Sequence, residues 1–127
     1  MADGASRNRS RSKRDVVAVS NPVRLLDLAK QEAHSVARWY ERRQTGLGRR
    51  FLQATHATLL AIEQHPTFFP HLETVPDDVP IRRAIMKEFP YLVIFEMRLD
   101  EILVLAVAHT KRRPNYWMSR RKKSSPL

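Results

Sequence analysis

The stretch ILVLAVAHTKRRPNYWMSR, residues 102–120, decides the fold and shows where to look for a function. Residues 102–108 are apolar at every position, which is typical of a strand with both faces buried in a sheet. The apolar run stops at His109, and a basic and aromatic segment follows that contains Lys111, Arg112, Arg113, Pro114, Tyr116, Trp117 and Arg120. The sequence therefore predicts a central strand that brings a histidine, several cations and two aromatic rings to one edge of a sheet.

Two further strands are expected immediately before this one. Apolar and polar residues alternate with a period of two over residues 81–87, and a second strand-like run covers residues 91–97. Phe89-Pro90 separates these two runs, and a polar turn at residues 98–101 leads into the central strand. Strands joined by such short turns pair as antiparallel neighbours, so this part of the chain should form a small antiparallel sheet.

Two amphipathic helices are expected in the first half of the chain. Apolar residues recur every three or four positions from 25 to 43 and again from 49 to 64, and Pro66 should end the second helix. The segment Gly46-Leu47-Gly48 breaks the pattern between them, and so short a link gives an antiparallel hairpin. The predicted fold is α+β with the order β-α-α-β-β-β-(α), in which this hairpin packs on a small, mainly antiparallel sheet.

A first strand and a long loop complete the expected elements. Val16–Val19 is a β-branched run that predicts a strand, after which Asn21 would cap the first helix with Pro22 at its first position. Residues 66–80 contain four prolines and are expected to form an ordered surface loop. Two aromatic residues should attach that loop to the core, Phe68 and Phe69.

The net charge of +10 is concentrated at the two ends of the chain. Residues 1–14 hold five cations and one acid, residues 110–127 hold seven cations and no acid, and residues 15–109 have a net charge of −1. Such ends attract a polyanion or an acidic protein partner. We expect a disordered basic arm over residues 1–14, either nucleic-acid-binding or without a role, then one domain over 15–120 and a basic tail over 121–127.

Composition excludes several classes of site. The chain has no cysteine, so it offers neither a disulfide nor a thiolate metal site, which suits a reducing cytoplasm. Its three glycines form no phosphate-binding loop, and its five histidines show no metal-ligand spacing. No apolar run approaches the roughly 18 residues that a membrane span needs. We therefore expect a cytoplasmic protein with no metal, no cofactor and no contact with a membrane.

The residues around the end of the last strand could support chemistry or simple packing. Histidine suits proton transfer near neutral pH, and guanidinium groups stabilise a charged phosphorane. His109 and Arg112, together with Arg82 or Arg83 from the neighbouring strand, could therefore cleave RNA without a metal ion. Alternatively, His109 ends the strand with a backbone hydrogen bond while the cations face water. Tyr116 and Trp117 are open in the same way, because they could stack on bases or pin a terminal segment to the core.

Three blocks of sequence together resemble a known family. They are ARWYERRQTGLGRRF at residues 37–51, RRAIMKEFPYLVIFE at 82–96 and ILVLAVAHTKRRPNYWMSR at 102–120. Over roughly residues 16–120, their order and spacing resemble the ParE/RelE superfamily of toxins from type II toxin–antitoxin systems, also called plasmid stabilisation proteins. The resemblance implies a RelE/ParE-like fold and a compact toxin, which a small cognate antitoxin blocks by wrapping around it in a hetero-oligomer.

The resemblance leaves two targets open. RelE-like members cut messenger RNA in the ribosome without a metal ion, whereas ParE-like members inhibit DNA gyrase. The RelE pattern commonly places an arginine inside the middle strand, where this chain has Leu92, so the resemblance favours the ParE-like branch. If the chain is an RNase, the residues that match catalytic positions are His109, Arg112 and Tyr116. A third alternative, supported by the basic ends, is a nucleic-acid-binding module without toxin activity.

For a target of any of these kinds, the expected binding residues are cations and one aromatic residue. They are Arg83, Lys111, Arg112, Arg113, Trp117 and Arg120.

Overall fold

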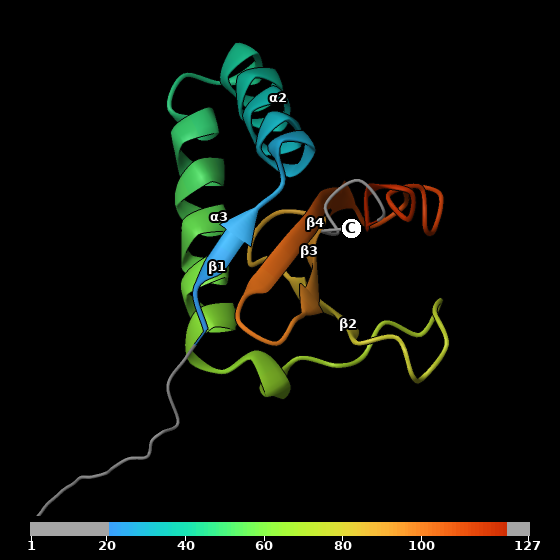
Figure 1. Ribbon diagram of the computed structural model, residues 1–127. Coiled ribbons are helices and arrows are strands. Elements are labelled where there is room, and N and C mark those ends of the chain that lie inside the picture. Colours follow the sequence, from blue (N-terminus) through green and yellow to red (C-terminus); the bar gives the residue numbers. More distant parts are fainter. Residues whose placement is uncertain (1–20, 122–127) are drawn as a thin grey trace, which may run out of the picture.

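Four strands form one mixed sheet in the computed structural model, which describes residues 21–121 (Figure 1). They are β1 (Val23–Leu25), β2 (Ile81–Ile85), β3 (Tyr91–Met97) and β4 (Ile102–His109), in the spatial order β1-β4-β3-β2. β1 runs parallel to β4, whereas β4 with β3 and β3 with β2 are antiparallel pairs. The antiparallel part of the sheet is thus confirmed, and β3 and β4 have the predicted bounds.

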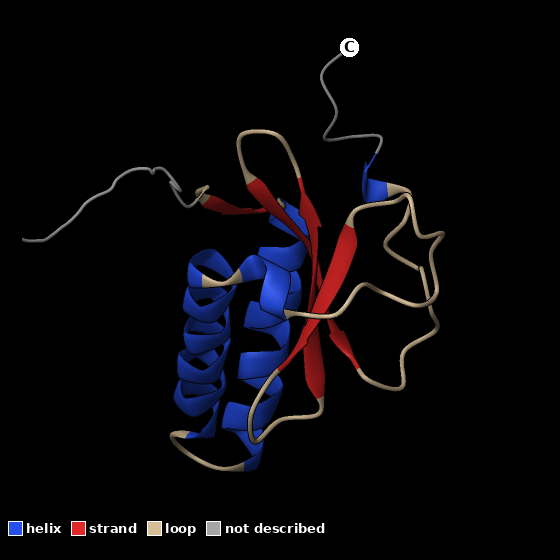
Figure 2. Cartoon of the chain, turned by 90° about the horizontal axis from the view of Figure 1, so that it is seen from below, coloured by secondary structure: helices blue, strands red, loops and turns tan. Residues whose placement is uncertain are grey.

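Two helices, α2 (Asp27–Arg43) and α3 (Leu47–Gln64), form the predicted antiparallel hairpin and cover one face of the sheet (Figure 2). α2 buries small residues at four-residue spacing, Ala29, Ala33 and Ala37, so its backbone can approach its neighbours closely. The opposite face is covered by irregular chain, which comes from the loop after the short helix η1 (Pro66–Phe68) and from the segment after β4. The α+β architecture predicted from the sequence is confirmed.

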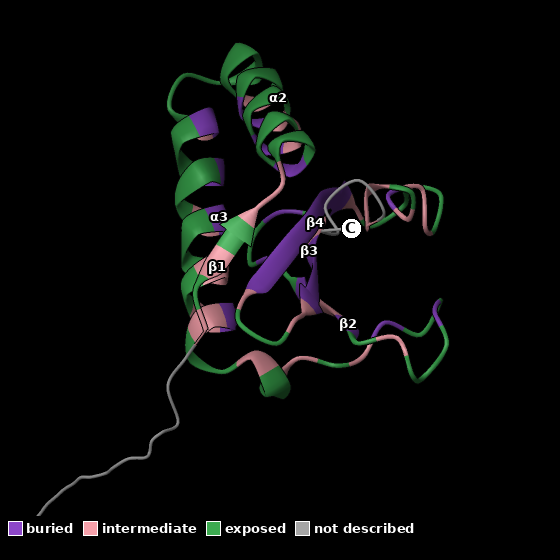
Figure 3. Ribbon diagram, viewed as in Figure 1, coloured by how far each residue is buried: buried purple, intermediate pink, exposed green. Residues whose placement is uncertain are grey.

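β4 is the central strand, as its apolar pattern predicted. It lies between β1 and β3, and every residue from Ile102 to Ala108 is buried (Figure 3). The register shifts beside Phe95, which pairs with Val104 while Ile94 pairs with Ala106, so Leu105 is an extra residue in β4. Because the side-chain period of a strand is two, this bulge places Val107 on the helix-covered face together with Val104.

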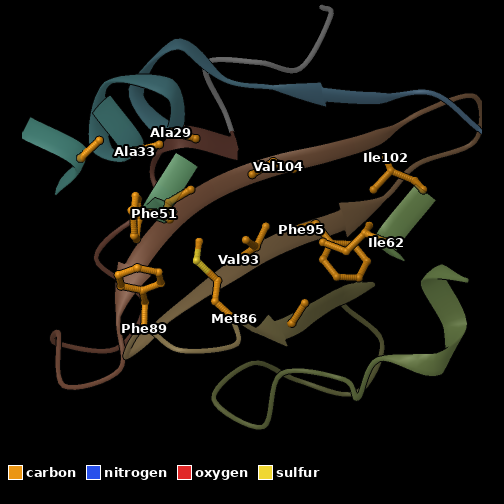
Figure 4. Close-up of a cluster of buried hydrophobic side chains, with 13 residues drawn as sticks. Ala29, Ala33, Phe51, Ile62, Met86, Phe89, Val93, Phe95, Ile102 and Val104 are labelled. Atoms are coloured by element: carbon orange, nitrogen blue, oxygen red, sulfur yellow. The ribbon is translucent and has the colours of Figure 1, made fainter. Parts of the chain in front are cut away.

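The main core lies between the helical hairpin and the sheet (Figure 4). Phe51 of α3 and Phe89 lie edge to face with 5.2 Å between ring centroids, and Met86 and Val93 belong to the same cluster. Full burial of one large apolar side chain contributes about 1.5–3 kcal/mol. This cluster therefore fixes the hairpin on the sheet and, with it, the position of α2 beside the end of β4.

A second core covers the opposite face of the sheet. The loop contributes Leu72 and Val75 to this core, and the segment after β4, residues 110–121, contributes Trp117. We call residues 110–121 the terminal segment. These side chains pack against sheet residues such as Ile94 and Leu103. The loop is also attached on the helix side, although only one of its two phenylalanines contributes. The ring of Phe69 lies edge-on to Phe95 at 6.1 Å, whereas Phe68 is 79% exposed and stacks on His65, so the prediction for Phe68 is wrong.

The start of the first helix differs from the sequence prediction. Leu26 is the N-cap of α2, and the residues just before it form β1, so Asn21 and Pro22 do not begin a helix. The cause is the parallel pairing of Val23 with Ile102, which holds residues 23–25 in an extended conformation. From the sequence alone, these residues look like the start of the helix.

Several predicted segments lie outside the described residues. They are the basic arm 1–14, the strand Val16–Val19 and residues 122–127 of the tail. Within residues 21–121, no helix is long and apolar enough to cross a membrane.

The link between the helices gives a physical reason for Glu41 and for the glycines at positions 46 and 48. Gly46 has a φ of 90°, a left-handed conformation that favours glycine. Glu41 accepts hydrogen bonds from the backbone N–H groups of Gly46 and Gly48, both at 3.0 Å, and so caps the N-terminus of α3. A Cβ at Gly48 would collide with the backbone oxygen of Ala37, so only glycine lets the helices meet this closely.

Candidate binding site at the end of β4

β4 ends at His109, whose ring lies edge-on to Tyr91 with 5.1 Å between centroids, on the helix-covered face. The His109 Nδ1 accepts a hydrogen bond from the backbone N–H of Lys111 (3.0 Å), and its carbonyl accepts one from the N–H of Arg112 (2.9 Å). These two bonds turn the chain at the strand end, as the packing alternative predicted. They also leave the side chains of Lys111, Arg112 and Arg113 exposed.

Arg112 rests on an aromatic platform. Its guanidinium carbon lies 3.8 Å from the centroid of the Tyr116 ring, within the range of a cation–π contact. The Tyr116 hydroxyl donates a hydrogen bond of 2.6 Å to Oε2 of Glu32 on α2. Arg120 pairs with the same carboxylate, with 2.9 Å between its Nη2 and Oε2. Glu32 thereby fastens the segment after β4 to α2.

The same network closes the free edge of β4. The last backbone hydrogen bond from the β1 side joins the N–H of Leu26 to the carbonyl of Val104 (3.1 Å). Beyond it, the N–H of Val107 donates to Glu32 Oε1 (3.0 Å), and the carbonyl of Leu105 accepts from Arg120 Nη1 (2.9 Å). Two side chains thus take the place of a neighbouring strand at this edge.

The environment of Tyr116 suits binding better than proton transfer. Burial, followed by the hydrogen bond to Glu32, raises the pKa of Tyr116 far above that of a free tyrosine. The hydroxyl therefore stays protonated at neutral pH and donates a hydrogen bond to Glu32. The hydrogen bond to Glu32 also raises the pKa of Arg120, so that the guanidinium stays charged.

Trp117 lies on the other side of the terminal segment. Its side chain is 1% exposed in the second core, so it packs this segment onto the sheet and offers no face on which a base could stack. Beside it, Arg121 Nη2 lies 2.8 Å from Oε2 of Glu96, which also pairs with Arg98. Burial alone would raise the pKa of Glu96, but the two arginines together hold it below its usual value. Glu32 and Glu96 therefore hold the terminal segment from opposite faces of the sheet.

The arginines of β2 do not join His109. Arg83 pairs with Ile94 of the second core, so it faces away from the helices, and its Nε lies 3.1 Å from Oε1 of Glu73. Arg82 Nη1 donates instead to the carbonyl of Phe69. The expected gathering of His109 with a cation from β2 is therefore wrong, since β2 lies at the far edge of the sheet from β1 and is separated from β4 by β3.

Leu92 occupies the position at which a RelE-like arginine would lie. It pairs with Ala108 of β4 and packs in the second core. That face of the sheet is filled by apolar side chains of the loop and by Trp117. The described residues thus place no cationic side chain at the Leu92 position.

A groove runs between α2 and the ends of β3 and β4. Its larger part has a volume of 560 Å³ and is lined by Ser35, Val36, Trp39, Tyr40, Pro90, Tyr91 and His109. A second part of 360 Å³ shares four of these residues and extends to Leu28, Glu32, Arg112 and Arg120. Arg112, one of the exposed cations after β4, therefore borders a groove whose other end is aromatic. Within residues 21–121, no group of three or more His, Asp or Glu side chains could hold a metal ion.

Glu32 and Trp39 belong to the site, although neither residue was predicted from the sequence. Glu32 lies between the buried residues Ala29 and Ala33 on α2, and a carboxylate at the border of an apolar stripe was the available signal. Trp39 is 43% exposed although it is a large aromatic residue. The sequence could not show which residues contact Glu32, because these residues lie in the segment after β4.

Residues 23–114 match a family described as "ParE toxin of type II toxin-antitoxin system, parDE". Among solved structures, the chain is similar to one described as "Chromosomal ParDE TA system from P. aeruginosa", with 14% sequence identity and a TM-score of 0.61. That similarity covers 71% of this chain and 96% of the other, and at such low identity it shows a shared fold. A comparison with curated proteins found no significant match. Because the family match spans most of the chain, this protein belongs to the ParE toxin family of type II toxin–antitoxin systems.

Proposed function

We propose that this protein is the toxin of a type II toxin–antitoxin module, that it acts in the cytoplasm by inhibiting DNA gyrase, and that a cognate antitoxin neutralises it in a hetero-oligomer. The observation that carries the proposal is the match of residues 23–114 to the ParE family. Features of the site support inhibition by binding rather than RNA cleavage. The Tyr116 hydroxyl is held by Glu32, and Leu92 lies within an apolar core.

The cations after β4 are the proposed contact with the target. Lys111, Arg112 and Arg113 are consecutive and exposed, and none of them pairs with a carboxylate of residues 21–121. Arg112 is also held in place by its contact with the Tyr116 ring. Three exposed positive charges on a rigid turn would steer the protein towards an acidic surface and give salt-dependent binding.

A supercoiling assay with purified gyrase tests the proposed target. We expect the full chain to inhibit supercoiling, and Arg112→Gln to weaken the inhibition. Arg49→Gln is the matched control, because it removes one exposed cation from α3 at a distance in sequence from the proposed contact. A ribosome-dependent mRNA cleavage assay is run with the same preparations.

Two results would contradict the gyrase proposal. If gyrase is unaffected while mRNA is cut in the ribosome, the protein is an RNase. His109→Ala should then slow cleavage by about 10²–10⁴-fold, the usual contribution of a general acid or base. If neither assay responds, a binding module without toxin activity becomes the better interpretation.

The proposed antitoxin site is a groove between α3 and the end of β2 at Ile85. It has a volume of 530 Å³ and is lined by Arg50, Gln53, Ala54, Ala57, Thr58, Ala61, Phe69, Ile85, Lys87 and Glu88. The α3 side consists mainly of small residues, and Ile85 is 59% exposed beside them. A groove of this shape fits the apolar face of an amphipathic segment, flanked by charges that can pair with its polar rim.

Substitution of Ala57 tests this groove. Ala57 is exposed, so Ala57→Arg should leave the fold and the toxicity intact while a long charged side chain fills the groove. Coexpressed antitoxin should then fail to restore growth. His56→Arg is the control, since it adds the same side chain at the neighbouring exposed position outside the groove. Full rescue of Ala57→Arg by the antitoxin would place the interface elsewhere.

A further inference from the structure

We propose that the groove beside β4 binds one unpaired nucleotide, with its base among Trp39, Tyr91 and His109 and its phosphate at Arg112. This groove is separate from the one between α3 and β2, and nucleotide binding does not require gyrase to be the target.

The aromatic part of the groove offers flat surfaces that are already fixed in position. Trp39 is 43% exposed, yet its ring is held by Arg43, whose guanidinium carbon lies 4.2 Å from the ring centroid, and by Tyr40, edge-on at 5.1 Å. The rings of Tyr91 and His109 line the same part of the groove. A base can stack on such rings whatever its identity, because every base has a π-face. The volume of 560 Å³ is within the range of about 300–1,000 Å³ that small ligands occupy.

The charge at the other end of the groove fits a phosphate. Arg112 lines it, and the exposed side chains of Lys111 and Arg113 are its neighbours in the chain. One acid also lines this part, Glu32, but its carboxylate already accepts hydrogen bonds from Tyr116 and Arg120. The phosphate would therefore meet the Arg112 guanidinium, which pairs with no described carboxylate, beside an acid that two hydrogen-bond donors already neutralise.

The backbone beside the groove argues against an extended peptide as the occupant. A peptide that adds to a sheet needs free N–H and C=O groups on the edge strand. At β4 the N–H of Val107 is taken by Glu32 and the carbonyl of Leu105 by Arg120. The groove therefore offers aromatic side chains and a cation, which a nucleotide uses, while two of the ladder positions that a strand would use are occupied.

Fluorescence anisotropy of a labelled oligothymidylate, titrated with the full chain, tests the proposal. Trp39→Ala should weaken binding by about fivefold to a hundredfold, the range that stacking of one base provides. Trp39→Phe keeps a ring and should retain most of the affinity, which separates stacking from loss of structure. Phe68→Ala is the control, because Phe68 is an exposed aromatic residue outside the groove.

The salt dependence tests the phosphate contact. The slope of log K against log salt concentration is negative, and Arg112→Gln should reduce its magnitude by about 0.7, the value for one phosphate contact on a single strand. Arg49→Gln should leave the slope unchanged. Competition by AMP would show that a free nucleotide suffices. Absence of competition, with the Trp39 dependence retained, would identify a nucleotide within a strand, and both results support the proposal.

Three results would overturn it. Equal losses of affinity in Trp39→Ala and Phe68→Ala would show that the basic ends alone attract the oligonucleotide. Duplex DNA that binds as tightly as the single strand would remove the need for an unpaired base. Competition by polyglutamate that matches unlabelled oligothymidylate, and that depends on Trp39, would identify an acidic peptide as the occupant.

Discussion

Gly48 lies where α2 and α3 approach closely, since a Cβ there would collide with the backbone oxygen of Ala37. We expect Gly48→Ala to lower the free energy of unfolding by about 1–3 kcal/mol, the usual effect of overpacking, measured by urea denaturation. Gln53→Ala, at an exposed position of the same helix, should change it by less than about 0.5 kcal/mol. Wild-type stability in Gly48→Ala would mean that the helices can separate without cost.

Single residues also show what could and could not be predicted from the sequence. Gly46 correctly marked the break between the helices, because glycine acts on the backbone locally, although Leu47 and Gly48 already belong to α3. The roles of Tyr116 and Arg120 could not be assigned in the same way. Both side chains meet Glu32, which belongs to α2, and a spacing pattern contains no information about such distant pairs.

At the scale of elements, Glu32 joins α2, β4 and the terminal segment through four hydrogen bonds. Glu32→Ala would leave the largely buried Arg120 guanidinium without its carboxylate, so we expect a loss of about 3 kcal/mol in stability. Hydrogen exchange at the N–H of Val107 should become faster in this variant. A double-mutant cycle with Tyr116→Phe should give a coupling energy of at least about 0.5 kcal/mol.

The control for that experiment is Gln31→Ala, an exposed position next to Glu32. It should change neither the stability nor the exchange of Val107 appreciably. If Glu32→Ala behaves like this control, the terminal segment is held by the second core and by Glu96 alone.

Elements with a strong local pattern were predicted better than elements that depend on their partners. β3 and β4 have the expected bounds, because long apolar runs between turns determine them. β1 has only three residues and is a strand through its pairing with β4. Its sequence looks like the start of the following helix, so it was not predicted. The bulge at Leu105 was equally invisible, yet it decides that Val107 and His109 face the helices.

At the scale of the whole molecule, all three tyrosines resist ionisation. Burial raises the pKa of Tyr40, Tyr91 and Tyr116, and Glu32 adds to the effect at Tyr116. A raised pKa in the folded state means that the stability is fully present below the unfolded value of about 10 and is lost as the pH rises above it. We expect phenolate absorbance to appear together with loss of the circular dichroism of the fold. Phenolate formation near pH ~10 with an intact spectrum would contradict this.

The position of β4 in the sheet has a consequence for how the protein is made. The central strand is also the last strand, and β1 has no partner until residues 102–104 have been synthesised. The second core then waits for Trp117. During translation, the helical hairpin and the β2–β3 pair can form first, but the four-stranded sheet cannot be completed before β4 leaves the exit tunnel. A nascent chain stalled before residue 102 would therefore lack both the β4 groove and the turn that carries Lys111, Arg112 and Arg113, the proposed contact with the target.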